Sequence, residues 1–375
     1  MEAIKITKRE KLLVDVIAGT RPNLMKVSPL ITALDKENWV KVRFINTGQH
    51  SSNFMFRNVA KSLQLRQPDE EFENVHGSQL QQLTKIVSQY EDLLLKEVSD
   101  VCVVVGDVTS SLACAISAAK MNVPVYHVEA GLRSFDKTMP EEVNRLLIDA
   151  LSSVMYTPSM DATKNLIDSG ISDDSIVFVG NIMIDAFEKQ KEVIKRRNIC
   201  KELNLQPGNY LVCTFHRPSN VDNPESLNSI IDQITKLSAT LPIVLPLHPR
   251  TKANILNFSK GTLPTGENIK TIEPLDYVDF MSLVIDSALV ITDSGGIQEE
   301  TTYLGIHCLT VRPNTERPIT ITEGTNQLIK IPEILDRALT VLKNNRGHKN
   351  NLTFWDGQTA NRIVSDMKKR LVGSN

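Results

Sequence analysis

Short apolar runs alternate with amphipathic stretches along the whole chain, a pattern typical of βα units on a parallel sheet. In the first half this pattern predicts strands over 12–19, 40–48, 100–107, 123–131, 153–158 and 175–181, and helices over 24–36, 79–97 and 110–120. In the second half it predicts strands over 209–217, 241–249, 288–296 and 307–313, and helices over 225–239, 276–286, 297–304 and 331–344. Several of these strands end in glycine or polar residues. Because ligands bind at the carboxyl ends of parallel strands, those ends are the candidate site.

The length of the chain predicts two domains. Its 375 residues exceed the roughly 250–300 that a single core usually organises. We expect a first α/β domain over 1–185 and a second over 186–357, joined by a charged helical stretch that begins the second domain. The last amphipathic stretch, 358–375, is expected to return and pack on the first domain.

Composition narrows the class of partner. Lys and Arg total 42 against 44 Asp and Glu, a net charge of −2, so no global basic excess exists to hold nucleic acid or an anionic membrane. The amino-terminal stretch predicts a strand rather than a signal peptide or membrane span. The five cysteines form no CxxC pair, which fits buried thiols in a reducing cytoplasm. The seven histidines lack metal-ligand spacing, so we expect no metal.

The motif DSGGIQEE, Asp293 to Glu300, follows an apolar run directly. A strand that ends in Ser294-Gly295-Gly296 and opens a helix is suited to phosphate, because glycine permits close approach and the first helical N–H groups are unpaired. Glu299 and Glu300, one turn later, are candidate partners for ribose hydroxyls. A plain strand-to-helix turn is the competing interpretation. No GxGxxG motif follows a strand and no GxxxxGK[ST] motif is present, which disfavours a nicotinamide enzyme or a P-loop ATPase.

A second motif, GTRPNLMK, places Arg21 and Lys26 in a loop-to-helix transition after the first predicted strand. Pro22 suits the first helical turn. Two cations at a helix start favour a diphosphate or nearby carboxylates. A solvated pair of surface cations is the competing interpretation here.

Carboxylates end neighbouring predicted strands. Asp107 ends VVVGD and Glu129 ends YHVEAG, while Glu141 and Glu142 stand in MPEEVNR. A carboxylate at the end of a buried strand is costly unless it is paired or functional, so these groups form a candidate acid–base set. Glu141 and Glu142 could instead simply occupy the first turn of a helix, with Arg145 as an i+4 partner.

The remaining candidates follow strands as well. His216 and Arg217 end LVCTFHR, where a histidine suits phosphate binding or proton transfer. His127 lies within a strand, where it is expected to be packed or to support Glu129. Gln49 and His50 follow the second strand, and Arg312 precedes the TERP motif.

Together these motifs resemble the non-hydrolysing UDP-N-acetylglucosamine 2-epimerases over nearly the whole chain. The motifs, in order, are GTRPxxxK, TGQH, GD, HVEAGLR, PEExNR, HR, DSGGIQEE and TERP. The resemblance implies a fold similar to GT-B glycosyltransferases, with two Rossmann-like domains and an active site in the cleft between them. It also implies a cytoplasmic homodimer that uses no metal or other cofactor, supplies surface polysaccharide synthesis, and takes a second UDP-sugar as activator.

The family chemistry implied by the resemblance eliminates UDP to a glycal and adds it back after protonation on the other face. By motif position, Asp107, Glu129, Glu141 and His216 are implied to be catalytic. The residues implied to bind substrate are Arg21, Lys26, Arg145, Ser294, Gly295, Gly296, Glu300 and Arg312, and those resembling the activator site are Gln49 and His50.

Three departures from the bacterial branch leave the sugar substituents open. Asn23 follows Pro22 where that branch has Glu, Pro218-Ser219 replaces Arg-Glu, and Ile319 replaces a Glu after TERP. A 2-epimerase of a diacetamido uronate or of another modified UDP-hexosamine therefore stays open. So do a hydrolysing 2-epimerase, against which Pro22-Asn23 argues, a GT-B glycosyltransferase and a non-catalytic sugar-nucleotide sensor.

Overall fold

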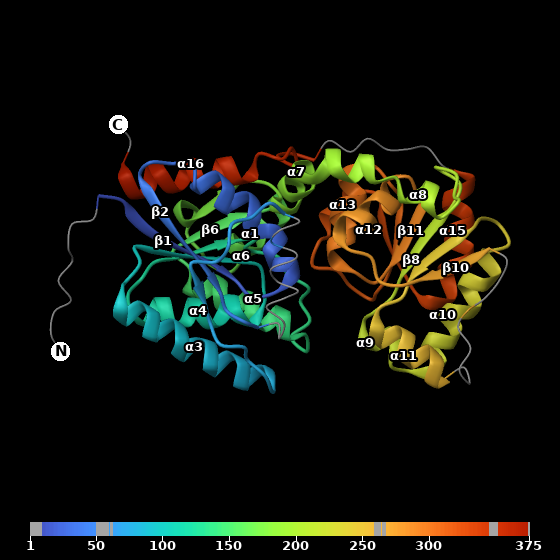
Figure 1. Cartoon of the computed structure of the whole chain (residues 1–375), viewed down its shortest axis with the longest axis horizontal. Helices are drawn as coiled ribbons and strands as arrows, with labels where there is room; N and C mark the ends of the chain where they lie inside the picture. The colour runs from blue at the N-terminus through green and yellow to red at the C-terminus, as the bar shows by residue number, and fades with distance from the viewer. Residues whose placement is uncertain are drawn as a thin grey trace. The chain divides into compact units, whose positions relative to one another are not determined.

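The chain folds as two compact units in the computed structural model, which describes residues 10–49, 60, 63–258, 264, 268–344 and 352–373. Unit 1 runs to Ala186 and takes in the chain from Thr353 onward, and unit 2 comprises Phe187–Leu352. Figure 1 labels the elements of both units.

Unit 1 contains a parallel sheet of seven strands in the order β3-β2-β1-β4-β5-β6-β7. Its strands are β1 (Leu12–Ala18), β2 (Val40–Asn46), β3 (Glu70–Glu71), β4 (Val101–Val105), β5 (Val125–Val128), β6 (Val154–Thr157) and β7 (Ile176–Phe178). Its helices are α1 (Arg21–Leu34), α3 (Gln79–Lys96), α4 (Thr109–Lys120), α5 (Pro140–Leu151), α6 (Met160–Asp168), the 3-10 turn η1 (Asp173–Ser175) and α16 (Thr359–Val372). The order of the strands reverses between β1 and β4, which makes that the point where ligands usually bind.

Unit 2 contains a parallel sheet of six strands in the order β10-β9-β8-β11-β12-β13, the order of a Rossmann fold. Its strands are β8 (Leu211–Thr214), β9 (Ile243–Pro246), β10 (Ile269–Ile272), β11 (Leu289–Thr292), β12 (Cys308–Val311) and β13 (Asn326–Ile329). Its helices are α8 (Ile199–Glu202), α9 (Pro218–Val221), α10 (Pro224–Leu237), α11 (Pro249–Phe258), α12 (Tyr277–Ile285), α13 (Gly295–Leu304), α14 (Ile319–Thr322), η2 (Ile331–Glu333) and α15 (Ile334–Lys343). Helix α7 (Ile182–Arg197) carries the chain from unit 1 into unit 2.

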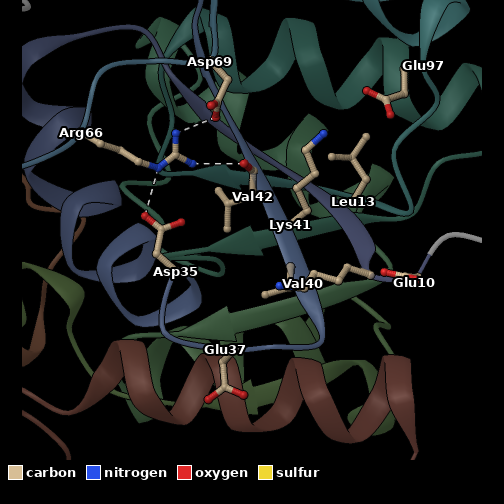
Figure 2. Close-up of a pocket in the computed structure, with 11 residues that line it drawn as sticks. Glu10, Leu13, Asp35, Glu37, Val40, Lys41, Val42, Arg66, Asp69 and Glu97 are labelled. Atoms are coloured by element: carbon tan, nitrogen blue, oxygen red, sulfur yellow. Dashed lines mark hydrogen bonds and ion pairs between the residues drawn. The ribbon is translucent and has the colours of Figure 1, made fainter.

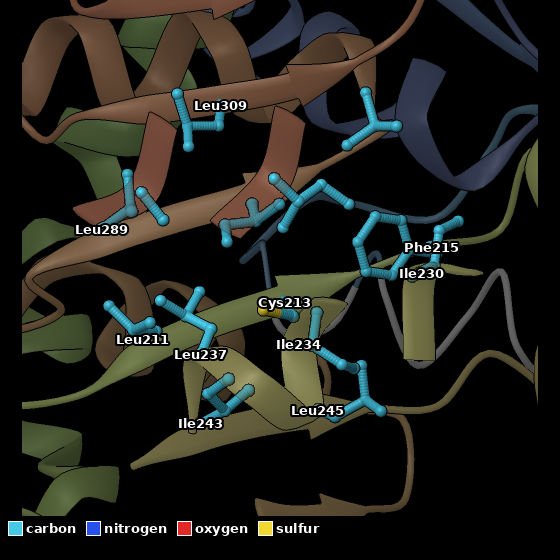
Figure 3. Close-up of a cluster of buried hydrophobic side chains, with 14 of the residues drawn as sticks. Leu211, Cys213, Phe215, Ile230, Ile234, Leu237, Ile243, Leu245, Leu289 and Leu309 are labelled. Atoms are coloured by element: carbon cyan, nitrogen blue, oxygen red, sulfur yellow. The ribbon is translucent and has the colours of Figure 1, made fainter. Parts of the chain in front are cut away.

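Alternate residues of the strands in unit 2 build separate cores on the two faces of the sheet. Leu211 and Cys213 of β8 pack with α10 and α15, and Figure 3 shows Ile230, Ile234 and Leu237 of α10 reaching toward them. On the other face, Val212 of β8 packs with α7, α8 and α12. Each strand is therefore buried on both sides, and this explains the near-continuous apolar runs in the sequence.

The predicted fold class is confirmed, because both sheets are parallel and helices cover their faces. The ten predicted strands all form, each a few residues shorter than its apolar run. The sequence pattern missed β3, β10 and β13. All three lie toward or at the edges of their sheets and are partly exposed, so they lack a continuous apolar run.

The last helix, α16, packs in unit 1 beside α1 (Figure 1). Its amino terminus is capped by Asp185, whose carboxylate accepts hydrogen bonds from the backbone N–H groups of Thr359 (3.0 Å) and Ala360 (2.7 Å). Tyr156 of β6 donates a hydrogen bond to Asp366 of the same helix at 2.9 Å. The carboxyl-terminal part of the chain is thereby joined to the first unit.

A buried ion pair joins the neighbouring strands β1 and β2 of unit 1. Asp15 of β1 and Arg43 of β2 are register partners, and Arg43 donates two hydrogen bonds to the Asp15 carboxylate, at 2.6 and 2.8 Å. Tyr90 of α3 donates a third, at 2.7 Å. Asp15 is completely buried, so the loss of its cationic partner would leave an uncompensated charge in the core.

We expect Arg43→Met to destabilise unit 1 by about 3–5 kcal/mol, the usual cost of breaking a buried ion pair. Both tryptophans, Trp39 and Trp355, belong to unit 1, so tryptophan fluorescence during urea unfolding reports this unit. Lys41→Met is the matched control, because Lys41 lies two residues earlier on β2 and is exposed. Equal urea midpoints for the two variants would contradict the prediction.

Candidate functional site

Two of the predicted catalytic residues of unit 1 are held by cations at the carboxyl edge of its sheet. Glu129 follows β5 and forms an ion pair with Lys26 of α1, with side chains that are 4% and 13% exposed. Gly106, which follows β4, lies against this pair: a Cβ there would stand 3.1 Å from the Glu129 Oε2 and 3.3 Å from the Lys26 Nζ. Glu129 also has a φ of +72°, a left-handed conformation that is strained for a non-glycine residue.

Arg145 of α5 holds the second carboxylate. Its guanidinium pairs with Asp107 and with Glu142, donating to the latter at 2.8 and 3.1 Å. The competing interpretation, in which Arg145 is the i+4 partner of Glu141, is therefore wrong. Burial alone would raise the pKa of Glu142, but the Ser134 backbone N–H and Arg145 outweigh it and lower that pKa. The side chain of Asp107 stays 27% exposed, so this carboxylate is accessible while its charge is balanced.

Glu141 is exposed, and it shares a cavity of about 240 Å³ with Asp107. The remaining wall of this cavity is formed by Thr20, Pro22, Gln49, Gln79, Val108, Thr109, Pro140 and Asn144. Gln49 accepts a hydrogen bond from the Ser110 backbone N–H at 3.0 Å, which orients its amide group at this wall. His50 and the side chain of Arg21, two further predicted site residues, lie outside the described residues.

In unit 2, Asp293 organises the carboxyl edge at the reversal of the strand order between β8 and β11. It is fully buried and accepts hydrogen bonds from the backbone N–H of His216 (3.1 Å) and of Arg217 (2.9 Å) and from Asn220 (3.1 Å). The His216 Nδ1 lies 3.1 Å from the same carboxylate. Burial would raise the pKa of Asp293, but these partners, His216 first, lower it. The His216 ring, 44% exposed, is thus oriented at the edge of the sheet.

The amino terminus of α13 opens toward free space, as DSGG predicts. A Cβ on Gly296 would meet nothing within 4 Å, whereas a Cβ on Gly295 would stand 2.7 Å from Glu316 and 2.9 Å from Arg317. A methyl group at Gly295 would therefore displace the ends of these two side chains, whereas one at Gly296 would displace nothing. Ser294 is the N-cap residue, and its side chain makes no capping hydrogen bond to the helix. The first turn of α13 accordingly offers backbone N–H groups and a hydroxyl to an anion.

Three arginines lie around this helix end. Arg312, after β12, donates to Glu316 at 2.9 Å, and its pKa is lowered, first by burial and also by the nearby charges of Arg217 and Arg317. Arg317 pairs with Glu316 and with Glu299, the latter at 2.9 Å. A cation whose pKa falls because of crowded positive charge is stabilised by an arriving anion. Glu299, considered for ribose from the sequence, is instead engaged by Arg317.

Glu300, the predicted ribose contact, is buried on α13 beside Tyr277. Burial raises the pKa of Glu300 to about 7, against the opposing hydrogen bond from Tyr277 and with a further contribution from the Glu299 charge. This carboxyl therefore changes its charge near neutral pH.

A larger cavity, of about 950 Å³, lies at the opposite, amino-terminal edge of the sheet in unit 1. Figure 2 shows the contacts of Arg66 there, which donates to Asp35 (3.0 Å), Asp69 (2.7 Å) and the Val42 carbonyl (3.1 Å). These charges neutralise one another, and none of the motifs lies at this edge. Among the described residues, no group of three His, Cys, Asp or Glu side chains is arranged to hold a metal ion. Nor is any described helix long and apolar enough to cross a membrane.

Comparison with known proteins assigns the family. Residues 32–368 match the family model described as UDP-N-acetylglucosamine 2-epimerase. The chain belongs to the UDP-N-acetylglucosamine 2-epimerase family. It is 39% identical to the UDP-N-acetylglucosamine 2-epimerase of Methanocaldococcus jannaschii, over 93% of this chain and 97% of that protein. The crystal structure of the M. jannaschii UDP-GlcNAc 2-epimerase in complex with UDP-GlcNAc and UDP has a TM-score of 0.86 at 37% identity, covering 95% of this chain and 99% of that one.

A second member of the family differs in its named substrate. The UDP-2,3-diacetamido-2,3-dideoxy-D-glucuronate 2-epimerase of Pseudomonas aeruginosa is 34% identical to this chain, over 94% of this chain and 98% of that protein. The family assignment confirms the resemblance on which the sequence interpretation rested.

One departure of this family member from the bacterial pattern has a structural explanation. Asn23 is buried, donates to the Val105 carbonyl at 2.8 Å and accepts from the Gly19 N–H at 3.2 Å. Its amide thus ties the loop after β1 to the end of β4. Both ends of its side chain are occupied by backbone groups, so Asn23 indicates nothing about the sugar.

Sequence reasoning missed Asp149 as a member of the site. It lies at the end of α5, is buried, and contacts both His127 and Arg133 of the HVEAGLR segment. His127 is completely buried, as the interpretation that it is packed predicts, and the hydrogen-bond partners of its ring are Asp149 and the Gly106 carbonyl. Asp149 stands in an ordinary amphipathic helix with no motif around it, so only spatial proximity reveals it.

We expect Glu300→Gln to stabilise unit 2 at pH 8. Folding raises the pKa of this carboxyl from 4.5 to about 7, so its stabilisation is complete below pH 4.5 and is lost as the pH rises to about 7. At pH 8 the free energy of unfolding of the variant should exceed that of the parent by about 1–3 kcal/mol, and this difference should shrink toward pH 5. Scanning calorimetry at both pH values measures this, with Glu225→Gln, an exposed glutamate of the same unit, as control. A gap that is independent of pH would show that Glu300 is ionised in the folded protein.

Proposed function

We propose that this protein interconverts a UDP-N-acetylhexosamine and its C2 epimer, of the UDP-GlcNAc and UDP-ManNAc type, without a metal ion. The observation that carries the proposal is the cavity of unit 1 that Asp107 and Glu141 line together, beside the Lys26–Glu129 pair. Several carboxylates at one sheet edge, each with a different degree of charge compensation, supply both an acid and a base. The family assignment supports the same activity.

The reaction begins with elimination, because the C2 proton is too weakly acidic for simple exchange. A carboxylate removes the C2 proton while the C1–O bond breaks, and the electron pair of that bond leaves with the UDP oxygen. The product is a glycal with a C1–C2 double bond. In the second step a proton arrives at C2 on the other face and the UDP oxygen bonds to C1 again. All atoms balance, and no oxidant or external base is consumed.

Asp107, Glu129 and Glu141 are assigned to the proton steps. Lys26 and Arg145 compensate the charges of Glu129 and Asp107 respectively while these carboxylates are ionised. Glu141 is exposed and is not paired by Arg145, which makes it the carboxylate with the greatest freedom to approach a sugar.

The nucleotide is assigned to unit 2. The helix start at Ser294 and Gly296, together with Arg312 and His216, binds the diphosphate, and Arg21 of unit 1 is assigned to the same group. Glu300 accepts from the ribose hydroxyls. Positive charge at this end stabilises the UDP oxygen when the C1–O bond breaks, which is where negative charge develops.

Further parts of the proposal follow the family. Gln49 and His50 are assigned to a second UDP-sugar that activates the enzyme. The enzyme is proposed to act as a cytoplasmic homodimer that supplies surface polysaccharide synthesis. A modified UDP-hexosamine is the second candidate substrate, favoured by the 34% identity to the P. aeruginosa diacetamido-glucuronate epimerase. A panel of UDP-hexosamines followed by NMR of the anomeric signals separates the two.

We expect turnover in deuterium oxide to place one deuterium at C2, in the product and eventually in the substrate, with sugar and UDP still joined.

Glu129→Gln keeps the size of the side chain but removes the carboxylate. It should slow epimerisation by about 10²–10⁴-fold, the usual contribution of a positioned acid–base group, while UDP still binds. Full activity is expected in excess EDTA. Mass spectrometry measures the deuterium content, and proton NMR measures the rate of epimerisation of the parent, of the variant and in EDTA.

The matched control is Glu70→Gln, because Glu70 is an exposed glutamate on the edge strand β3 of the same unit. Retention of hydrogen at C2 in an epimerised product would exclude the elimination route. Free sugar and UDP as main products would identify a hydrolysing enzyme, and transfer of sugar to an added acceptor would identify a transferase. Loss of activity in EDTA that magnesium or zinc restores would contradict metal independence.

We expect Gly296→Ala to weaken UDP binding at least tenfold with no loss of stability. The space around this residue is open, so a methyl group strains nothing in the protein, yet it projects at the helix end assigned to phosphate. Calorimetric titration measures the affinity and thermal unfolding the stability. Gly295→Ala is the contrasting variant, because its methyl group would meet the ends of Glu316 and Arg317 and would not project into open space. Unchanged affinity in Gly296→Ala would place the nucleotide elsewhere.

A further inference from the structure

His127 is enclosed in unit 1 between two groups that accept hydrogen bonds. Its side chain is completely buried on β5. The ring Nδ1 lies 2.7 Å from the Asp149 Oδ1, and the Nε2 lies 3.0 Å from the Gly106 carbonyl oxygen. A backbone carbonyl can only accept, so the Nε2 must carry a proton. The protonation state of the ring then depends on whether Asp149 is ionised.

The surroundings of Asp149 show that it is ionised. Its second oxygen, Oδ2, lies 2.7 Å from the Arg133 Nη1 and 3.3 Å from the Gly131 backbone N–H, both of which are donors. An ionised carboxylate can only accept, so the Nδ1 must also carry a proton. Both ring nitrogens are then donors, which defines an imidazolium.

The same carboxylate holds the chain on both sides of Glu129. Asp149 contacts His127, two residues before Glu129, and Gly131 and Arg133, two and four residues after it. Between these contacts the backbone of Glu129 takes its left-handed conformation, with a φ of +72°. A strained residue keeps such a conformation only when its surroundings impose it. Asp149 is therefore a major element of that constraint.

The other ring nitrogen reaches the second carboxylate through the backbone. The Gly106 carbonyl that accepts from His127 belongs to the peptide bond that leads into Asp107. The carbonyl of Asp107 accepts in turn from the Asn144 Nδ2 at 2.8 Å, and its carboxylate pairs with Arg145. His127 thus helps to orient the peptide that presents Asp107 to the cavity.

We propose that His127 is held as a buried imidazolium and that it acts with Asp149 as a positioning pair for Glu129 and Asp107. Neither residue touches the reacting atoms. The pair keeps two carboxylates, from two different strand ends, in the relative geometry that proton transfer requires. The catalytic part of this inference rests on the proposed function, whereas the imidazolium is a property of the protein alone.

The protonation state can be tested without any turnover. In the full-length protein with ¹⁵N-labelled histidine, both ring nitrogens of His127 should show the protonated, imidazolium shift at pH 7. Its signals are those that disappear in His127→Gln. Should that variant not fold, they are those whose ring N–H protons exchange most slowly, because His127 is the buried histidine among the described residues. An unprotonated ring nitrogen at pH 7 would overturn the proposal.

The positioning role is tested by Asp149→Asn, which keeps the shape but removes the charge that requires an imidazolium. We expect kcat for epimerisation, and with it the rate of deuterium entry at C2, to fall about 10–100-fold, because small misplacements of reacting groups have effects of that size. KM and the affinity for UDP should change less than about twofold. Asp185→Asn is the matched control, a buried aspartate of the same unit that caps α16 and lies outside the site.

Equal kcat in Asp149→Asn and Asp185→Asn would overturn the positioning role. A matching rise in KM and loss of UDP affinity would also overturn it, because that result indicates a general structural defect. If the parent protein epimerises no UDP-hexosamine, the proposed function fails, and the histidine NMR still decides the protonation state.

Discussion

Buried charge governs how this protein is built. In a parallel α/β sheet the strands are covered on both faces, so a carboxylate at a strand end loses contact with water. The energetic cost of that loss must be offset by a cation that the chain supplies. The uncompensated cost is several kcal/mol for each ion. Unit 1 meets this requirement with Lys26 for Glu129 and Arg145 for Asp107. Within the strands themselves, Arg43 does the same for Asp15. Each cation comes from a helix or strand other than that of its carboxylate, so the pairs also fix how the elements pack.

The two units share one sheet topology but place different charges at the carboxyl edges of their sheets. In both, the strand order reverses beside the first strand of the sheet, and the loops after the strands on either side of the reversal present the polar groups. In unit 1 the loop after β4 carries Asp107 and the loop after the neighbouring β5 carries Glu129, and Arg145 and Lys26 balance their charges. In unit 2 the loop after β11 opens helix α13, and Asp293 orders the His216 loop after β8. The first arrangement suits proton transfer, and the second suits a phosphate group that gains negative charge.

The same pairings limit which residues can act. Glu142 is occupied by Arg145 and the Ser134 loop, and Glu299 is occupied by Arg317, although both stand beside a predicted site residue in the sequence. Successive helical residues point in directions about 100° apart, so neighbours in the PEE and QEE motifs meet different surroundings. One member of each pair, Glu142 or Glu299, stabilises the local structure. Of the other members, Glu141 lines the cavity of unit 1 and Glu300 is buried beside Tyr277.

The elements and the chemistry of the strand ends could be predicted without a structure. Apolar runs report burial on both faces of a strand, and amphipathic periods report one buried helix face, so ten strands, most helices and the fold class followed from pattern alone. Motifs such as DSGGIQEE and HVEAGLR indicated the family. Edge strands such as β10 and β13 escaped because partial exposure removes the apolar signal.

The partners in each ion pair were decided by how the helices and strands pack in three dimensions. Arg145 of α5 pairs with Asp107, which follows β4, and not with Glu141 of its own helix. Asp149 contacts His127, which lies 22 residues earlier in the sequence. Periodicity describes how each element faces its own environment, whereas an ion pair depends on the distance between side chains on different elements. That distance is set by the packing of helices on the sheet, which no local pattern records. The positioning pair behind Glu129 was therefore invisible until the fold brought α5 against β5.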